Sequence, residues 1–268
     1  MQLKIASTIA EALRFSLHHA VPFYLLGMVV GLPTYLHSFV PRQRQTLNLP
    51  GGSHEALLPR PWWETDLAVP AVEAVLLGIM VAIMVHTLRR DRRGQARAVL
   101  PSLAEAAPRL PTVIAVSLTI KLAETLVGAG GVFLGDFIGS VAGIIFFFPF
   151  LALLFILYLV FCVAIPCAAV GDAGVINAFR RSAALTEGSR GRLFSISVVF
   201  FLPLFLAVGV VVWLFRDTVF LGGFPALGFW LFGAAIVVYF SALIVVIHEA
   251  LVAMKEGADA GTLATVFD

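Results

Sequence analysis

Three ionisable residues interrupt long apolar runs in this chain, where a charge has to find a partner. Glu73 lies in one run, and Lys121 and Glu124 lie three residues apart in the next, so the latter two share one face of a helix. If the two runs are antiparallel neighbours, all three side chains lie within reach of one another. We predict a polar network of Glu73, Lys121 and Glu124 that fixes helix packing. A site for transport or proton relay is the alternative.

A second group of side chains, between the fourth and fifth apolar runs, is suited to binding phosphate. These are Arg180, Arg181, Arg190 and Arg192. Asp172 is a suitable N-cap and Gly188 a suitable residue just past a helix end, which predicts a helix over residues 173–187. Its apolar face would carry Val175, Ile176, Phe179 and Ala183. A basic helix of this kind lies in the membrane interface, so we predict that the four arginines contact anionic lipid headgroups.

A metal site is the third possibility that the residue types raise. Side chains able to ligate a metal are expected near one end of their helices: His18, His19, His86, His248 and Glu249. Val252, however, stands where a zinc-protease motif would need its second histidine. Cys162 and Cys167 supply only two ligands, which do not make a site. We therefore expect no metal and no cofactor.

Motifs for enzymatic chemistry are absent from the sequence. It contains no glycine-rich phosphate loop, no G-x-S-x-G elbow and no paired-carboxylate motif outside the apolar runs. The densest charged segment, RRDRRGQAR at 89–97, is short and lacks aromatic residues, so we expect no nucleic acid as a partner. We interpret it as a loop that fixes membrane topology and contacts anionic lipids. We expect the protein not to be an enzyme.

The elements that carry these residues are indicated by the composition. Hydrophobic residues make up 60% of the 268 residues and charged residues 13%, and the mean hydropathy is +0.99. These values are typical of an integral membrane protein and not of a soluble helical bundle. Six runs are long enough to cross a bilayer as helices: residues 19–39, 67–88, 111–134, 141–165, 193–215 and 226–250.

Lysines and arginines are distributed unevenly between the two sides of such a bundle. Thirteen of the 18 lie on the side that holds both chain ends, and four lie on the other. The positive-inside rule then places both termini in the cytoplasm. The first 30 residues lack a suitable cleavage site, so we expect the N-terminus to be retained. We expect a multi-pass protein of a bacterial cytoplasmic (inner) membrane.

Short amphipathic segments precede the first, third and fifth apolar runs. We predict interfacial helices at 3–17, 98–109 and 173–187, so that a short helix, an outward span and an inward span recur three times. The predicted fold is all-α: a single membrane domain over residues 1–268, with six transmembrane helices and three interfacial helices on the cytoplasmic side.

The largest segment on the opposite side is the loop at 40–66. Its four prolines and its paired glycines, Gly51 and Gly52, predict little regular structure. Trp62 and Trp63 are best interpreted as an interfacial anchor. In the third run, glycines such as Gly128 predict close packing of helices.

The central part of the chain carries a motif. Pro166 should kink or end the fourth run, and the following helix has the pattern A-x-x-R-S-x-x-L-T-x-G. The matching residues are Pro166, Gly174, Ala178, Arg181, Ser182, Leu185, Thr186 and Gly188. This stretch resembles the family named after the membrane domain of glycerophosphoryl diester phosphodiesterase. The tail, with Lys255, Glu256, Gly257 and Asp259, is similar to that of alphaproteobacterial-type members.

The resemblance covers the layout of the whole chain, but its specific motifs cover only the central stretch and the tail. Gly171 stands where the family usually has a glutamate, and Gly191 replaces a usual tryptophan. The resemblance implies a polytopic membrane fold. It does not imply phosphodiesterase activity, because that chemistry belongs to a separate barrel domain of about 250 residues.

These observations lead to two hypotheses about function. We expect a lipid-interacting scaffold or an accessory subunit of a membrane complex, with anionic lipids at the cytoplasmic face and a second membrane protein as its candidate partners. The alternative is a transporter of small molecules or lipids that uses the polar residues around Lys121. A wet central cavity containing Lys121 would favour the transporter, whereas a packed core would favour the scaffold.

Overall fold

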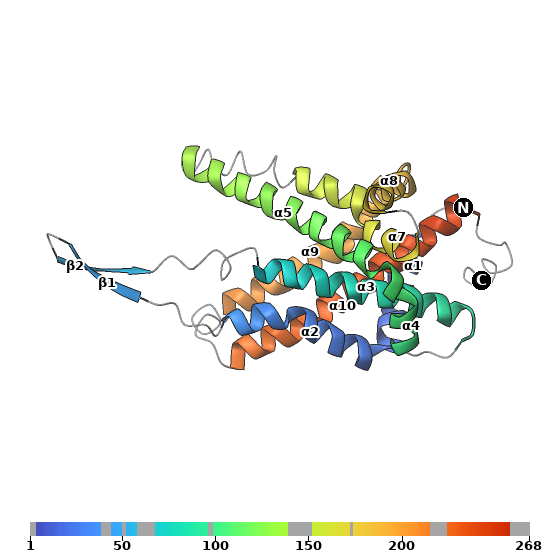
Figure 1. Ribbon diagram of the computed structural model, residues 1–268, viewed down its shortest axis with the longest axis horizontal. Coiled ribbons are helices and arrows are strands. Elements are labelled where there is room, and N and C mark those ends of the chain that lie inside the picture. Colours follow the sequence, from blue (N-terminus) through green and yellow to red (C-terminus); the bar gives the residue numbers. More distant parts are fainter. Residues whose placement is uncertain are drawn as a thin grey trace.

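Long helices lying side by side make up most of the protein, with short helices gathered at one end (Figure 1). The computed structural model describes residues 4–38, 44–49, 52–57, 68–95, 99–138, 152–171, 174–214 and 224–257. The long helices are α2 (Ala20–Ser38), α3 (Ala68–Arg92), α5 (Leu110–Ile138), α9 (Arg190–Leu214) and α10 (Phe224–Lys255). The short ones are α1 (Ile5–His18), α4 (Val99–Ala106), the 3-10 turn η1 (Ala107–Arg109), α7 (Ala164–Val170) and α8 (Val175–Thr186). Residues 152–161 are also helical.

Among the described residues, one β-hairpin departs from the helical fold, and it lies at the end away from the short helices (Figure 1). Strand β1 (Arg44–Leu49) pairs antiparallel with β2 (Gly52–Leu57), from Arg44 opposite Leu57 to Leu49 opposite Gly52. The prediction of little regular structure in the loop at 40–66 was therefore wrong for this part. Its prolines stand outside the paired residues, so none of them removes a donor from the ladder. Trp62 and Trp63 lie outside the described residues.

Several helices have the length and composition of membrane spans. Within the described part of the chain these are Ala68–Arg92, Val99–Gly128, Ala152–Val170 and Trp230–Lys255, and the bent pair Ile5–His18 and Ala20–Leu36 is a fifth if it counts as one. Large apolar side chains are exposed on the outer surface: Val21 by 73%, Leu122 by 55% and Leu126 by 64%. Such a surface suits lipid and not water. The structure therefore has four or five helices suited to crossing a membrane, and the count of six stays a prediction.

Close approaches between long helices occur at two glycines. A Cβ atom on Gly27 of α2 would lie 2.8 Å from the carbonyl oxygen of Ala234 on α10, and one on Gly78 of α3 would lie 2.3 Å from Ser117 Oγ on α5. Small residues of this kind let helix backbones come together where both are surrounded by lipid. No atom would meet a Cβ on Gly128 within 4 Å, so the packing role predicted for that glycine was wrong.

The short helices pack in a repeating order. α1 contacts α10, α4 contacts α3, and α8 contacts α7. In the predicted scheme, each short helix opens a unit of one short helix and two spans. Each short helix thus packs against the last helix of another unit: α1 against the third unit, α4 against the first and α8 against the second. The buried faces share one spacing: Thr8, Ala12 and Ser16 on α1, Ser102 and Ala106 on α4, and Ala178, Ser182 and Thr186 on α8. Small side chains four residues apart form a flat face that allows this close docking.

The break in the fourth apolar run is confirmed. Residues 152–161 are helical, Cys162 and Val163 form a turn, and α7 starts at Ala164. Pro166 lies in the first turn of α7, where a missing backbone N–H leaves no hydrogen bond unmade. The end of α8 is also as predicted: Gly188 follows the C-cap residue Glu187 with φ of +76°, in the left-handed region that favours glycine.

The start and the buried face of α8 differ from the prediction. Its N-cap is Gly174, and Asp172, the predicted cap, lies outside the described residues. The buried side chains are Ala178, Ser182, Leu185 and Thr186, whereas Ile176 is 69% exposed. Ser182 Oγ donates to the carbonyl of Val160 at 2.9 Å, just before the break, where helix carbonyls lack their usual donors. The polar residues of the motif therefore dock α8, and Ile176 faces outward.

Candidate functional site

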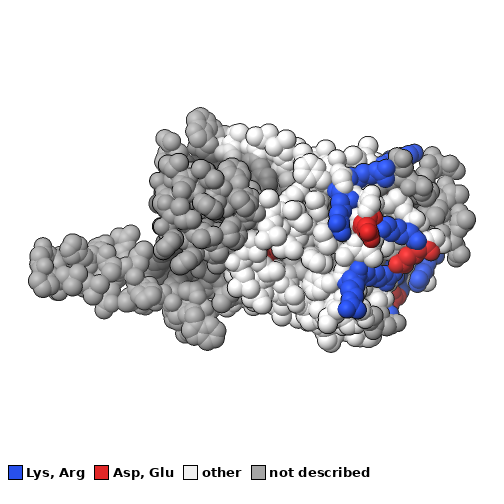
Figure 2. Space-filling model, turned by 90° about the horizontal axis from the view of Figure 1, so that it is seen from above, with Lys and Arg blue, Asp and Glu red and all other residues white. Residues whose placement is uncertain are grey.

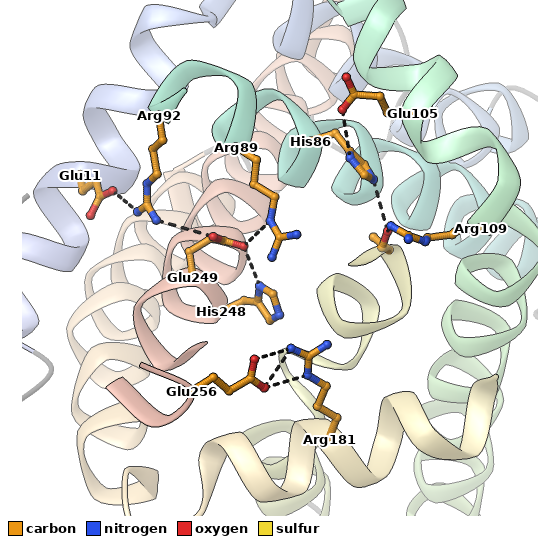
Figure 3. A network of polar contacts seen from close by, with 11 residues as sticks. Glu11, His86, Arg89, Arg92, Glu105, Arg109, Arg181, His248, Glu249 and Glu256 are labelled. Atoms are coloured by element: carbon orange, nitrogen blue, oxygen red, sulfur yellow. Dashed lines mark hydrogen bonds and ion pairs between the residues drawn. The ribbon is translucent and has the colours of Figure 1, made fainter. Parts of the chain in front are cut away.

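Charged side chains gather at one end of the protein, over the short helices and the end of α10 (Figure 2). Arginines of α3 and α8 alternate there with carboxylates from α1, α4 and α10 (Figure 3). Away from this end, Figure 2 shows few charged side chains among the described residues. This uneven distribution makes the charged end, which we call the basic end, the candidate functional site.

Glu249 of α10 is the centre of the first group of contacts. Its Oε1 accepts a hydrogen bond from Arg89 Nε at 2.9 Å, and its Oε2 lies 3.6 Å from Arg92 Nη1. Arg92 Nη2 also donates to Glu11 Oε1 at 2.7 Å. The Glu249 side chain is only 10% exposed, so this carboxylate needs its two arginine partners. The group ties α1, α3 and α10 together (Figure 3).

A second group joins α3, α4 and the end of α7. Arg90 Nη1 donates to Glu105 Oε1 at 2.6 Å, and His86 Nδ1 lies 3.5 Å from Glu105 Oε2. His86 Nε2 lies 3.2 Å from the carbonyl oxygen of Ala169, and because a carbonyl only accepts, Nε2 carries the proton. Arg109 Nη1 donates to the same carbonyl at 3.3 Å. The Ala169 carbonyl therefore has two donors at the end of α7.

A third group holds α8 against the end of α10. Arg181 binds Glu256 through three hydrogen bonds of 2.7 to 3.1 Å, with both carboxylate oxygens engaged. Lys255 Nζ donates to the carbonyl of Ala184 on α8. Both carboxylate and guanidinium are partly exposed, so this contact orients α8 more than it adds stability.

His248 lies beside the first group and is fully buried. Its Nδ1 lies 3.2 Å from Glu249 Oε1, close enough for an ion pair but outside hydrogen-bond geometry. Of the residues proposed above as metal ligands, Glu249 belongs to the first group with His248 beside it, His86 belongs to the second, and His18 and His19 lie next to each other on α1 and its C-cap. No cluster of three or more histidine, cysteine, aspartate or glutamate side chains suited to a metal occurs within the part of the chain that the structure describes.

The arginines predicted to contact lipid lie on α8 and at the start of α9, at the same basic end. Arg180 and Arg190 are exposed and Arg192 is half-buried. Over the described ranges none of these three forms an ion pair, in contrast to Arg181, which Glu256 binds. The structure thus divides the predicted set into one arginine with a carboxylate partner and three whose charge is not neutralised within the described protein.

The predicted network of Glu73, Lys121 and Glu124 is only partly present. Lys121 Nζ donates to Glu124 Oε2 at 3.2 Å, but the two side chains are 37% and 52% exposed, so the pair lies on the outer side of α5. Glu73 is half-buried and makes no ion pair in the described segments. The expectation of a three-membered network inside the bundle was therefore wrong for these residues. The physical reason is that the depth of a residue in the membrane does not determine how its helix is rotated about its own axis.

Two cavities lie near these groups. The first, of about 470 Å³, is at the basic end and is lined by His86, Arg89, Arg93, Glu105, Pro108, Arg109, Thr112 and Gly171. The second, of about 370 Å³, lies deeper and is mainly apolar, with Leu77, Thr119, Ala123, Glu124, Tyr158 and Phe240 in its lining. Both volumes are in the range of small-ligand sites.

Sequence reasoning missed the binding of Glu249 by arginines of α3. The sequence places Glu249 and the arginines near the same end of their helices, which is the one signal available beforehand. The partners lie 160 residues apart, however, and their neighbourhood depends on how α3 and α10 pack. Arg109 also lines the cavity of about 470 Å³, although in the sequence it is only one of the 13 basic residues assigned to the side that holds both chain ends.

The fold and the basic end define the class of this chain as a predominantly helical protein with several helices apolar enough to cross a membrane. No family model, no curated protein and no solved structure matches it.

Proposed function

We propose that this chain is a non-enzymatic integral membrane protein that binds anionic lipid headgroups at its basic end and serves as a scaffold or accessory subunit of a membrane complex. The proposed topology has six spans, formed by α2, α3, α5, residues 152–170, α9 and α10. The basic end and both termini face the cytoplasm of a bacterial inner membrane. The motif in α8 supports membership of the family named after the membrane domain of glycerophosphoryl diester phosphodiesterase.

The observation that carries this proposal is the exposed positive charge on α8 and α9. Arg180 and Arg190 are exposed, and neither forms an ion pair in the ranges that the structure describes. Arg190 is the first residue of the long apolar helix α9, and Arg180 lies on α8, one of the short helices gathered at one end (Figure 1), where our topology places the headgroups. Each arginine near a membrane surface contributes roughly 1 kcal/mol to the binding of anionic lipid. Three such charges together would favour anionic lipids over zwitterionic ones around this end.

The test compares the three unpaired arginines with the paired one. The variant R180Q/R190Q/R192Q should lose most of the anionic lipid that co-purifies in polymer discs, measured as phosphatidylglycerol and cardiolipin per protein by mass spectrometry. R181Q is the matched control, because Glu256 already binds that guanidinium, and it should retain the wild-type ratio. An unchanged lipid ratio in the triple variant would leave these arginines with a topological role only. Proteins that stay bound in the same discs identify the partner complex.

A transporter is the second candidate, and Glu124 is the observation in its favour. This carboxylate pairs with Lys121 on the outer side of α5 and also lines the mainly apolar cavity of about 370 Å³ formed by α3, α5, residues 152–170, α8 and α10. An ionisable group that lines a cavity between apolar helices is typical of substrate pathways. Reconstitution in vesicles separates the two functions. The scaffold proposal requires that fluorescent phospholipids move between leaflets no faster than in empty vesicles, with E124Q indistinguishable from wild type.

A further inference from the structure

The larger cavity at the basic end has the lining of an anion site. It is formed where α3, α4, η1, α5 and the end of α7 meet, and its volume is about 470 Å³. Three guanidinium groups line it, those of Arg89, Arg93 and Arg109, together with the single carboxylate of Glu105. Arg90, which is not part of the lining, already binds that carboxylate at 2.6 Å. Arg89 is in turn bound by Glu249 at 2.9 Å, so the excess of positive charge in the lining comes from Arg93 and Arg109.

The walls of this cavity are held in place by contacts that do not involve a ligand. Glu249 binds Arg89 at 2.9 Å, and the Ala169 carbonyl accepts from both His86 and Arg109. His86 is buried at 7% exposure. Arg93, in contrast, is an exposed residue of the lining. A site with fixed walls binds without first paying to order its side chains, and Arg93 is available to close over a bound group.

We propose that this cavity binds a phosphate group, and that its source is the headgroup of an anionic phospholipid. Arginine recognises phosphate through paired N–H donors, so three guanidinium groups around one cavity match the several oxygens of a phosphate. Thr112 of α5 contributes to the lining, which leaves a hydroxyl for a further oxygen. The lipid source rests on the proposed function, whereas the phosphate chemistry rests on the cavity itself.

The position of the second cavity supports a lipid as the source. Thr119 and Ala123 of α5 line the apolar cavity, and they lie 7 and 11 residues beyond Thr112 on the same face of the helix. At 1.5 Å per residue, Thr119 is about 10 Å deeper in the membrane. A phosphate beside Thr112 would therefore have apolar lining below it, along which an acyl chain can extend.

The experiment uses delipidated full-length protein in detergent and three probes. Dihexanoyl phosphatidylglycerol carries headgroup and tails, glycerol 3-phosphate carries the phosphate without tails, and dihexanoyl phosphatidylcholine is the zwitterionic comparison. Binding is measured by calorimetry for wild type, R93Q/R109Q, R93E and R14Q. R93E changes a single exposed residue and should fold normally, so it tests the site even if the double variant fails to fold. Arg14 is an exposed arginine of α1 outside the cavity, which makes R14Q the matched control.

We expect phosphatidylglycerol to bind wild type, with an affinity at least about tenfold lower in R93Q/R109Q and in R93E, and within about twofold of wild type in R14Q. Equal binding of glycerol 3-phosphate, with the same loss in the variants, supports the phosphate site and assigns it to a soluble phosphate compound. Absence of binding to wild type, or equal affinity in all four proteins, overturns the proposal. The lipid content of R180Q/R190Q/R192Q is a separate measurement, so the proposed function can fail or hold independently.

Discussion

At the scale of single residues, Glu249 is the most constrained charge in the described protein. Its side chain is largely buried, binds Arg89 and lies near Arg92. His248, the preceding residue of α10, also contacts it. Burying a carboxylate without a counterion is costly. The arginines of α3 supply that counterion, in addition to the topological role predicted for them. The segment 89–97 therefore has a role inside the protein in addition to the one predicted for it.

Replacing Glu249 should destabilise the protein more than replacing Glu105. E249Q leaves Arg89 beside a neutral amide, and removal of one partner of a buried ion pair costs about 3–5 kcal/mol. Glu105 is 40% exposed, and a pair of that kind contributes about 0–1 kcal/mol, so E105Q is the matched control. Thermal unfolding of the three proteins in one detergent should show a midpoint that falls by at least about 5 °C for E249Q and by less than about 3 °C for E105Q. Equal midpoints would mean that water reaches Glu249.

At the scale of elements, the residues that carry the family resemblance have a structural explanation. Ala178, Ser182 and Thr186 form the buried face of α8, Arg181 ties that helix to Glu256, and Gly188 ends it. α1 and α4 bury small residues at the same spacing without the rest of the motif. The motif thus describes how one short helix docks at the end of the bundle, and none of its residues needs a catalytic role to account for its contacts.

The contact between α2 and α10 provides the prediction at this scale. A methyl group added by G27A would lie 2.6 Å from Val238 Cγ2 and 2.8 Å from the Ala234 carbonyl oxygen. Because a backbone atom cannot rotate away, the two helices must separate, which costs about 1–3 kcal/mol in a well-packed contact. The midpoint of thermal unfolding should fall accordingly.

The control for this prediction is G228A, on α10, where a new Cβ meets no atom within 4 Å. Alanine has a higher helix propensity than glycine, so G228A should leave the midpoint unchanged or raise it slightly. If G27A behaves like G228A, then α2 and α10 do not approach each other as closely as the structure shows.

The positions of the helices could be predicted from the sequence much better than their orientations. Apolar runs and the Pro166 break place the long helices, because these features are local along the chain. The face that each helix buries depends on its neighbours. For that reason Ile176 is exposed although it was placed on the apolar face, and Lys121 pairs with Glu124 on an exposed side of α5. In lipid, an exposed isoleucine has no cost, so hydrophobicity alone does not select the buried face.

The same distinction holds for the candidate site. Lys121 and Glu124 are three residues apart, and their ion pair follows from helix geometry alone. The cavity with Arg89, Arg93 and Arg109 needs α3, α4, η1, α5 and the end of α7 to meet, and no spacing in the sequence encodes that meeting. The sequence predicted a loop at 89–97, but Arg89 belongs to helix α3, and the cavity between the elements was not predicted.

At the scale of the whole molecule, the two ends of the bundle differ in charge and in structure. The short helices, the ion-pair groups and the end of α10 occupy one end, and the hairpin β1–β2 occupies the other (Figure 1). Several arginines at the basic end bind carboxylates, yet Arg93, Arg180 and Arg190 remain exposed. Because exposed arginines resist translocation, we expect this arrangement to favour the same orientation as the uneven count of basic residues in the sequence.

The last prediction tests that orientation with single cysteines in a C162A/C167A background. Ser53 lies in the hairpin, whereas Gln95 follows α3 and Asn177 lies on α8, and the latter two side chains are exposed at the basic end. If the basic end faces the cytoplasm, a membrane-impermeant maleimide added to intact spheroplasts should label S53C and should leave Q95C and N177C unlabelled until the membrane is permeabilised. Labelling of Q95C and N177C from outside, with S53C protected, would show that the protein has the opposite orientation in the membrane. It would also place the arginines of α8 in the wrong leaflet for the lipid binding proposed above, because the anionic surface potential acts at the cytoplasmic face.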